Sequence, residues 1–336
     1  METEKTKRKF TKVPAPVCAL GLGLACLASA TGGFAAFLAI PALAIWSYVL
    51  AVGAIIPLAL YLLKIAFNFP AFKQDLKHPV FTSIIPAFAM AVMILSHFLG
   101  LIDTMSGIVL WFIGIGLHVV FTITFLFSVI KGFKWENFIP AYYVAPVGIV
   151  VGVVCGAGFA PTLGVTFSTL NLFIFWYGLF WYIGLLPDMI ARLAQKTIPE
   201  PKKPTIIIMN APPNLLVAGY MTLSLPPFNY ITVEPVLALM LVILSLVTTV
   251  YVYIMLFKKL LWMKFNPGFA AYTFPTVIAG VGMLKYGVYL GLQGNPLHIL
   301  FKELAVIEFI ASTIIVLYVA VSFLYFLVIK PKIGAK

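Results

Sequence analysis

The sequence predicts an all-α fold: a polytopic membrane protein with ten transmembrane helices, paired as five helical hairpins in a quasi-five-fold ring around an axis. Three observations lead to this prediction. The 336-residue chain is 62% hydrophobic and only 10% charged, whereas a soluble globular domain carries about 25% charged residues. Prolines recur at a regular spacing inside the apolar stretches, and the basic residues gather on alternate connections.

The apolar stretches are long enough to cross a bilayer, which takes about 20 helical residues. We expect spans at 14–33, 39–66, 80–102, 106–130, 138–160, 164–190, 206–224, 232–262, 268–292 and 299–329. An even number of spans leaves both termini on one side of the membrane. We therefore expect one transmembrane domain at 14–330, preceded by a basic tail at 1–13 and followed by a second tail at 331–336.

The recurring prolines suggest the ring. Five of them lie in charge-free stretches at intervals of roughly 60 to 70 residues, the length of one helical hairpin: Pro16, Pro86, Pro146, Pro213 and Pro275. Proline removes a backbone N–H and clashes with the preceding turn, so a helix accepts it where a kink is useful and neighbouring groups compensate. We expect one kinked helix in each hairpin.

The basic residues support an even span count. All but two of the 22 lysines and arginines fall on the terminal segments and the even-numbered connections. Such residues are enriched on the cytoplasmic side, which predicts a multi-pass protein of the plasma (cell inner) membrane with both termini in the cytoplasm. The net charge of +12 therefore reports topology. Binding of nucleic acid is not expected, because no soluble domain carries a basic patch.

The N-terminal stretch has a second interpretation. Its basic run and the apolar residues before Ala28-Ser29-Ala30 also fit a cleaved signal peptide. Cleavage would delete the first helix of the first hairpin, so a retained span is the better prediction. Three cysteines, Cys18, Cys26 and Cys155, lie inside expected spans. They suit small apolar side chains, and their spacing indicates neither a disulfide framework, a metal site nor a cofactor.

The two helices of each hairpin differ in composition. The odd-numbered spans hold the prolines and many glycines, and they have no acidic or basic side chain before Lys285, whereas the even-numbered spans are bulkier. An inner ring of odd spans and an outer, lipid-facing ring of even spans is the simplest arrangement. We expect Lys285 and Glu308 to form an ion pair in the outer leaflet, with each other or with Lys302 and Glu303, because an isolated charge inside a membrane is costly.

A run on the ninth span carries a family resemblance. The residues Phe265-Asn266-Pro267-Gly268-Phe269-Ala270-Ala271-Tyr272-Thr273-Phe274-Pro275-Thr276 resemble the ninth helix of the tellurite-resistance and dicarboxylate transporter family. That family includes bacterial TehA and the plant guard-cell slow anion channels. Further similarity lies in Pro14-Ala15-Pro16, His78-Pro79-Val80 and Pro140-Ala141-Tyr142. The long regulatory N-terminal tail of the plant channels has no counterpart in the sequence, so control by phosphorylation is not expected.

The resemblance implies a homotrimer in which the five hairpins of each subunit surround a central pore, with Phe274 as its plug. A separate physical argument supports that position. Phe274 lies about ten residues beyond Lys264, or ~15 Å deep at 1.5 Å per residue. An apolar ring across a narrow neutral pore excludes the water that an ion needs. The alternative is that Phe274 is one of 29 phenylalanines and only packs in the core.

The predicted function is a gated channel for small monovalent anions such as chloride or nitrate, and the anion preference comes from the resemblance. The alternative is a proton-coupled transporter or exporter of dicarboxylates such as malate, of sulfite or of tellurium oxyanions. An enzyme is not expected, because no cluster of acids or metal ligands is present. The polar side chains of the odd spans can solvate an anion or bond their own backbone: Thr82, Ser83, Asn210, Asn214, Thr222, Thr273 and Thr276.

Overall fold

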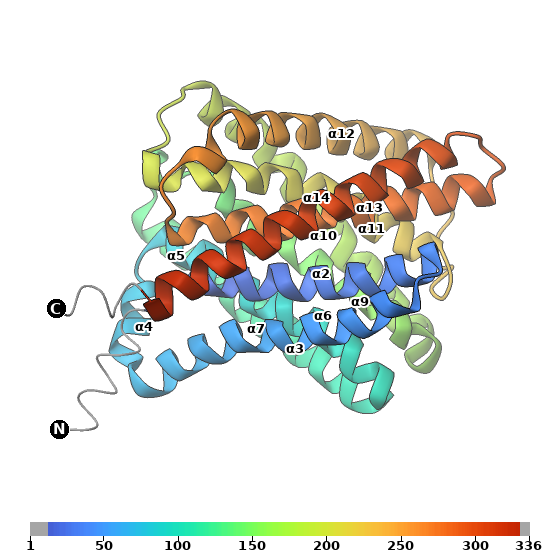
Figure 1. Ribbon diagram of the computed structural model, residues 1–336, viewed down its shortest axis with the longest axis horizontal. Coiled ribbons are helices and arrows are strands. Elements are labelled where there is room, and N and C mark those ends of the chain that lie inside the picture. Colours follow the sequence, from blue (N-terminus) through green and yellow to red (C-terminus); the bar gives the residue numbers. More distant parts are fainter. Residues whose placement is uncertain (1–12, 330–336) are drawn as a thin grey trace.

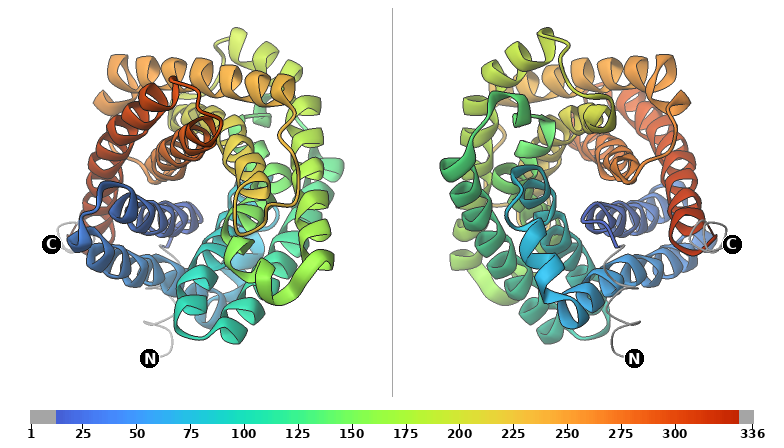
Figure 2. Two further views of the ribbon diagram at one scale, coloured as in Figure 1. Left: turned by 90° about the vertical axis from the view of Figure 1, so that its right-hand side faces the viewer. Right: turned by 90° about the vertical axis from the view of Figure 1, so that its left-hand side faces the viewer.

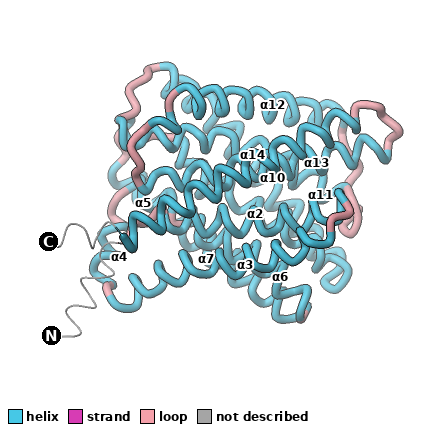
Figure 3. Tube along the Cα trace, viewed as in Figure 1, coloured by secondary structure: helices cyan, strands magenta, loops and turns pink. Residues whose placement is uncertain are grey.

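Long helices run between the two ends of the molecule in the computed structural model, which describes residues 13–329 (Figure 1). Both ends of the described chain lie at one end of the molecule, here called the terminal end, and the opposite end is called the far end. Connections are confined to these two ends (Figure 3). The expected tails at 1–13 and 331–336 lie outside the described residues, apart from Val13, and so do their basic residues.

Within residues 13–329, nine helical segments are long and apolar enough to cross a bilayer. They are Val17–Leu38, Pro41–Phe67, Pro79–Ile102, Thr104–Gly132, Pro140–Ala194, Glu200–Ser224, Pro235–Trp262, Pro267–Leu292 and His298–Val328. The protein is therefore a polytopic membrane protein. The count is lower than the predicted ten because the fifth and sixth expected spans are continuous in helix. That segment has 55 residues and turns at Gly164, whose φ of 69° suits glycine.

Five segments form an inner ring. At least 67% of the most apolar stretch is buried in each of them, against 33% or less in the other four segments. The ring contains α2 (Val17–Leu38), α6 (Pro86–Ile102), α9 (Val151–Gly156), α11 (Ala211–Ser224) and α13 (Thr273–Leu292). Each helix packs on the next in this order, and α13 packs on α2. The ring therefore closes on itself, as the views along the helices show (Figure 2).

The outer helices wrap this ring. They are α3 (Pro41–Phe67), α7 (Thr104–Gly132), α10 (Ala160–Ala194), α12 (Pro235–Lys258) and α14 (His298–Leu324). Each contacts the inner helix next to it in the chain. Large apolar side chains such as Ile45, Val120, Phe180 and Ile307 are more than half exposed. This exposure suits lipid contact, because apolar side chains lose nothing in hydrocarbon.

The inner segments are broken rather than smoothly kinked. A short or 3₁₀ helix on the terminal side precedes the regular α-helix in four of them: α5 (Pro79–Ile84), η2 (Pro140–Tyr143), η5 (Glu200–Asn210) and η7 (Pro267–Tyr272). The recurring prolines lie at these transitions. Pro16 caps α2, and Pro86, Pro213 and Pro275 lie in the first turns of α6, α11 and α13. Proline is tolerated there because the first turn lacks N–H partners in any case.

Two short elements complete the segment around Pro146, namely α8 (Val144–Val147) and η3 (Gly148–Val150). η4 (Ala157–Phe159) then connects α9 to α10. On the terminal side, α4 (Phe69–Asp75), η1 (Trp135–Asn137) and η6 (Leu260–Trp262) lie in connections, and η8 (Tyr325–Ile329) extends α14. These elements break the predicted regular spans at the ends without altering their order.

The ring closes most tightly between α2 and α13. A Cβ atom added at Gly23 would lie 2.1 Å from the Thr273 hydroxyl oxygen. Only glycine allows this approach, because any side chain would overlap Thr273. The Thr273 hydroxyl also donates to the carbonyl of Ala19 on α2, at 3.2 Å. The residue before Phe274 is thus fixed against the first inner helix.

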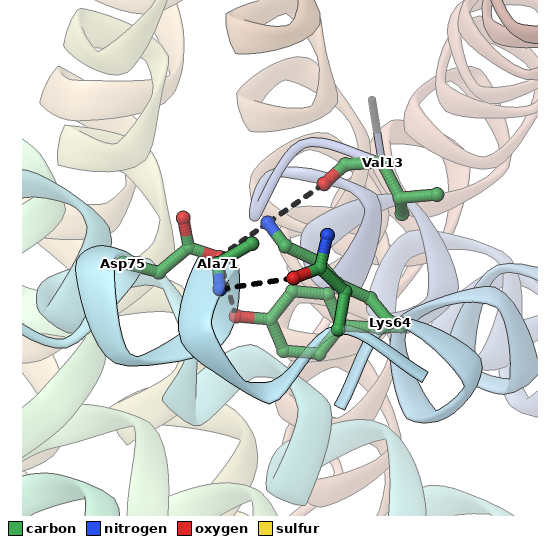
Figure 4. A network of polar contacts seen from close by, with 6 residues as sticks. Val13, Lys64, Ala71 and Asp75 are labelled. Carbon is green, nitrogen blue, oxygen red and sulfur yellow. Dashed lines mark hydrogen bonds and ion pairs between the residues drawn. The ribbon is translucent and has the colours of Figure 1, made fainter. Parts of the chain in front are cut away.

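A buried ion pair holds the start of the described chain at the terminal end. Lys64 Nζ, in the last turn of α3, lies 2.6 Å from Asp75 Oδ2 and 2.9 Å from the Val13 carbonyl (Figure 4). The Tyr61 hydroxyl donates to the same carboxylate at 3.2 Å. We call these four residues the anchor cluster. The sequence placed Lys64 among the basic residues of the cytoplasmic side and gave no sign of a partner, whereas Lys64 is 3% exposed.

Candidate ion pathway

Two cavities follow one another along the inner ring. The terminal-side cavity is lined by five inner segments, and its residues recur at helical spacing: Pro16, Ala19, Leu22, Ile84, Ala87, Met90, Tyr143, Val144, Val147, Gly148, Thr205, Ile208, Ala211, Pro212, Leu215, Gly268, Ala270, Ala271, Phe274 and Pro275. About 60 Å³ of it is open to the centres of water molecules. That volume accommodates a few waters.

The far-side cavity is smaller and lies further along the same helices. It is lined by Cys26, Ser29, Ile94, Val151, Val154, Cys155, Leu215, Phe274, Ile278 and Val281. About 20 Å³ is open to water centres, which is room for little more than one molecule. On α2, α6, α13 and the segment around α9, these residues follow those of the terminal-side cavity by one or two turns.

Phe274 and Leu215 are shared by both cavities. Both side chains are buried, at 6% and 2% exposure. They lie on α13 and α11, which pack directly on each other. Two apolar side chains therefore lie at the boundary between two small spaces. The sequence had singled out Phe274 but not Leu215, whose only signal was its helical spacing from Ile208 and Pro212.

The pathway residues are almost all apolar. Ser29 and Thr205 carry the hydroxyls, Tyr143 a phenol, and none of the cavity residues is charged. Pro16 and Pro275 line the terminal-side cavity, whereas Pro86, Pro146 and Pro213 do not line either cavity. Pro212, the neighbour of Pro213, faces the terminal-side cavity instead. The prolines thus shape the inner segments, and only some of them face the open space.

The polar side chains expected to solvate an anion bond to the protein. Thr273 and Thr276 donate to carbonyls one turn earlier in the chain, at 2.8 Å each. Asn210 donates to the Pro275 carbonyl at 3.0 Å and accepts from Thr249 at 2.8 Å. The others are similarly occupied: Thr82, Ser83, Asn214 and Thr222. In this structure, these polar groups bond to other protein groups and so contribute to helix packing rather than to contact with an ion.

Lys285 and Glu308 are not paired. The Glu308 carboxylate accepts a hydrogen bond from the Tyr253 hydroxyl of α12 at 2.8 Å. The Glu308 Cβ lies 3.3 Å from the position that a Cβ at Gly280 would take, so Glu308 packs against Gly280. Gly280 and Lys285 are five residues apart on α13, which places them on different helix faces. Within residues 13–329, Lys285 makes no hydrogen bond or ion pair.

Basic side chains lie on the terminal side of the inner segments, here called the basic terminal mouth. Lys202 Nζ donates to the Asn137 side chain at 2.9 Å, and Arg192 Nη2 donates to the Glu136 carbonyl at 3.3 Å. Burial, and after it the charge of Lys202, lowers the pKa of His78 from its usual value. A positive potential at a mouth raises the local concentration of anions.

No group of three or more histidine, cysteine or acidic side chains lies together within the described part of the chain, so no metal site is formed there. A closed ring of membrane-spanning helices around apolar cavities is the architecture of a channel or transporter. Sequence comparison gives the family: the SLAC1 family, described as voltage-dependent anion channel, matches residues 13–324. The chain belongs to this family, and the resemblance predicted from the ninth span is confirmed.

Two curated relatives add a more distant comparison. Both come from Methanocaldococcus jannaschii and are described as uncharacterized transporters. Each is 30% identical over 154 residues, which cover 41% of this chain and 43% or 42% of the relative. The chain thus matches less than half the length of these relatives. Membership of the SLAC1 family makes transport of an anion the function to be tested.

Proposed function

We propose that this protein is a gated channel for small monovalent anions such as chloride or nitrate, in which Phe274 and Leu215 form the gate. One observation carries the proposal: these two apolar residues are shared by the cavities on either side of them. Membership of the SLAC1 family supports an anion as the permeant ion.

The gate acts by excluding water. An ion that crosses an apolar constriction must shed much of its hydration shell, and a constriction without polar groups offers no replacement. The hydroxyls near Phe274 already bond to backbone carbonyls, so they are poor substitutes for water. The pathway is closed to ions while both side chains remain in place, and it opens when Phe274 swings aside or is removed.

The architecture that we propose has ten crossings, arranged as five hairpins around this pathway. The segment Pro140–Ala194 would be ~80 Å long as one straight helix, far more than the ~30 Å hydrocarbon core. Two crossings that turn at Gly164 resolve this mismatch. Both termini face the cytoplasm of a plasma membrane in this proposal, and a homotrimer is adopted from the family resemblance.

Truncation of the gate is the first prediction. Phe274→Ala should raise anion current by about tenfold or more, because removing the ring lets water fill the constriction. Current is measured in planar bilayers or liposomes with symmetric chloride, together with the melting temperature. Phe88→Ala is the matched control. Phe88 is equally buried on an inner helix, at 7% exposure, but lines neither cavity.

The control separates gating from packing. Loss of a core phenylalanine typically costs about 3–5 kcal/mol of folding free energy, so Phe88→Ala should lower the melting temperature and leave the current unchanged. Leu215→Ala should raise the current less than Phe274→Ala does. Equal, low currents from all three variants would refute the gate, and a current carried by cations would refute the proposed ion.

Orientation supplies the second prediction. Cysteines introduced separately at Lys73, Lys134, Lys196 and Lys259 should react with impermeant thiol reagents only from the cytoplasm, because basic residues are retained on that side. A cysteine at Gln293, in the connection at the far end, is the opposite-side control. Reaction of two of the four lysine positions from outside would overturn the proposed topology.

A proton-coupled transporter is the second candidate, and Glu308 is the observation that favours it. A carboxyl inside a membrane span is a common proton carrier. Glu308, however, lies in a groove between α12 and α14, with Thr249, Tyr253 and Met283, and not in either cavity. If the protein is a carrier, its flux should saturate with substrate, and Glu308→Gln should uncouple this flux from proton movement. A channel passes current without proton exchange.

A further inference from the structure

We propose that Lys285 forms a binding site for a small inorganic anion at the far mouth of the pathway, and that this site contributes the anion preference of the pore. The inference rests on the proposed channel function. It supplies what the apolar lining lacks, namely a fixed positive charge beside the route of the ion. The site lies at the opposite end from the basic terminal mouth.

The position of Lys285 on α13 places it in line with the pathway. Phe274, Ile278 and Val281 line the far-side cavity, and they recur at the three- and four-residue spacing of one helix face. Lys285 follows Val281 by four residues and Ile278 by seven. It therefore continues the same face by one further turn toward the far end, just beyond the narrow cavity.

Neighbours on two other inner segments support this placement. Lys285 lies within electrostatic range of Cys155, which lines the far-side cavity, and of His97 on α6. His97 follows Ile94, another lining residue, by three residues. Both Lys285 and His97 are half-buried. Residues of two other inner segments thus lie in the neighbourhood of Lys285.

Lys285 has no protein group that neutralises it. No ion pair or hydrogen bond of this side chain occurs between residues 13 and 329, and Glu308 on α14, the partner expected from the sequence, bonds Tyr253 instead. It is also the only lysine, arginine, aspartate or glutamate of α2, α6, α9, α11 and α13. A lone half-buried ammonium is costly inside a membrane unless water or an anion reaches it.

The chemistry of the site favours a small monovalent anion. One ammonium group offers three N–H donors and a single charge, with no second cation among the inner helices to balance a dianion. The adjoining cavity has room for about one water molecule, which favours an ion that passes singly. Binding through one flexible side chain is weak, as rapid conduction requires.

The experiment compares two neutralised lysines on the open background of Phe274→Ala. Lys285→Gln should raise the chloride concentration that half-saturates the current from the far side by roughly threefold to tenfold. This is the effect of one charge at short range in a partly aqueous site. The variant should also reduce the ratio of chloride to sodium permeability, measured from the reversal potential. Lys302→Gln is the matched control. Lys302 is also half-buried near the far end, but it belongs to the outer helix α14 and its ammonium lies over the Phe37 ring.

A cysteine variant tests the charge after the protein has folded. In a background where Cys26 and Cys155 are alanine, Lys285→Cys is modified from the far side with a cationic or an anionic thiosulfonate. The cationic reagent should restore chloride selectivity, and the anionic reagent should reduce it further. Lys285→Arg should behave like the unmodified protein.

The outcomes distinguish the two proposals. If the Phe274→Ala background carries no anion current, the channel function itself is refuted. If that background conducts anions, and Lys285→Gln matches Lys302→Gln in both half-saturation and selectivity, the site at Lys285 is refuted. Equal effects of the two thiosulfonates would also refute it, because bulk rather than charge would then be responsible.

Discussion

Two of the lysines in the membrane-spanning segments, Lys64 and Lys285, lie in opposite surroundings. Lys64, at the terminal end, is 3% exposed and is satisfied by Asp75 and the Val13 carbonyl. Lys285, near the far end, is half-buried and has neither an acid nor a carbonyl as partner within the described residues. The first belongs to an outer helix and faces protein, and the second belongs to an inner helix and faces the pathway in our proposal.

The difference indicates what each charge does. A buried ion pair gains little net stability, but breaking it leaves one charge uncompensated and is expensive. Lys64 therefore holds structure together: it ties the chain before α2 to α3 and α4. An unpaired lysine contributes nothing comparable to the fold and is free to act on a passing ion. We expect loss of Lys64 to affect stability and loss of Lys285 to affect conduction.

The largest expected effect on stability comes from breaking the anchor cluster. Lys64→Met leaves the Asp75 carboxylate buried without a counter-charge, which should cost about 3–5 kcal/mol. The melting temperature in detergent should fall accordingly. Lys285→Met should change stability by about 0.5 kcal/mol or less, in the range of a residue without specific partners.

The double variant provides the control. Lys64→Met combined with Asp75→Leu removes both charges, and it should recover most of the loss, because an apolar pair of similar volume often replaces a buried ion pair without penalty. If the double variant is as unstable as Lys64→Met, the hydrogen bond to Val13 rather than the ion pair is the main contribution. If Lys285→Met is the more unstable variant, the comparison between the two lysines is wrong.

A smaller effect is expected from the hydroxyl of the anchor cluster. Tyr61→Phe removes the hydrogen bond to Asp75, which is 3.2 Å long, while the aromatic packing on Phe72 remains. The cost should be about 0.5–1.5 kcal/mol, the usual net value of one hydrogen bond. Thermal unfolding of Tyr61→Phe and Lys64→Met, measured side by side, compares the two losses of stability. A loss for Tyr61→Phe as large as that for Lys64→Met would contradict this prediction.

The smallest effect is expected at an exposed acid of the far end. Asp103 caps α7 and accepts a hydrogen bond from the Ser106 backbone N–H at 2.8 Å. Hydrogen bonding with Ser106 lowers the pKa of the Asp103 carboxyl. Because the folded-state pKa lies below the unfolded value, the cap stabilises the protein above the unfolded pKa of about 3.9, and this contribution is lost as the pH falls through the folded pKa.

The measurement is the difference in melting temperature between the unmodified protein and Asp103→Ala, followed from neutral pH downward. The difference should shrink below about pH 4. Asp103→Asn is the control: it keeps a side-chain oxygen that caps the helix but cannot ionise, so it should lack this pH dependence. A difference that grows on acidification would show that the carboxylate destabilises α7.

The sequence by itself determined the class of the protein and singled out a few of the residues that line the cavities, namely Phe274, Pro16 and Pro275. Hydropathy and charge are local properties of a segment, so they identified the spans and the alternation between inner and outer helices. The family motif on the ninth span identified Phe274 and led to the family that the comparison confirms. The recurring prolines predicted a kink in each hairpin, and the inner segments break near these positions. The sequence did not predict that the turns before the breaks are short or 3₁₀ helices, because neighbouring helices decide how the freed backbone groups are satisfied.

Only the tertiary structure decided which side chains meet. Leu215 joins Phe274 because α11 and α13 are rotated about their axes so that both faces point inward. The same rotation turns Gly280 toward Glu308, which bonds Tyr253 rather than Lys285. Helix rotation is set by close contacts such as Gly23 on Thr273, which involve residues far apart in the chain. Hydropathy has no information on such contacts, since any rotation of an apolar helix within the protein leaves its composition the same.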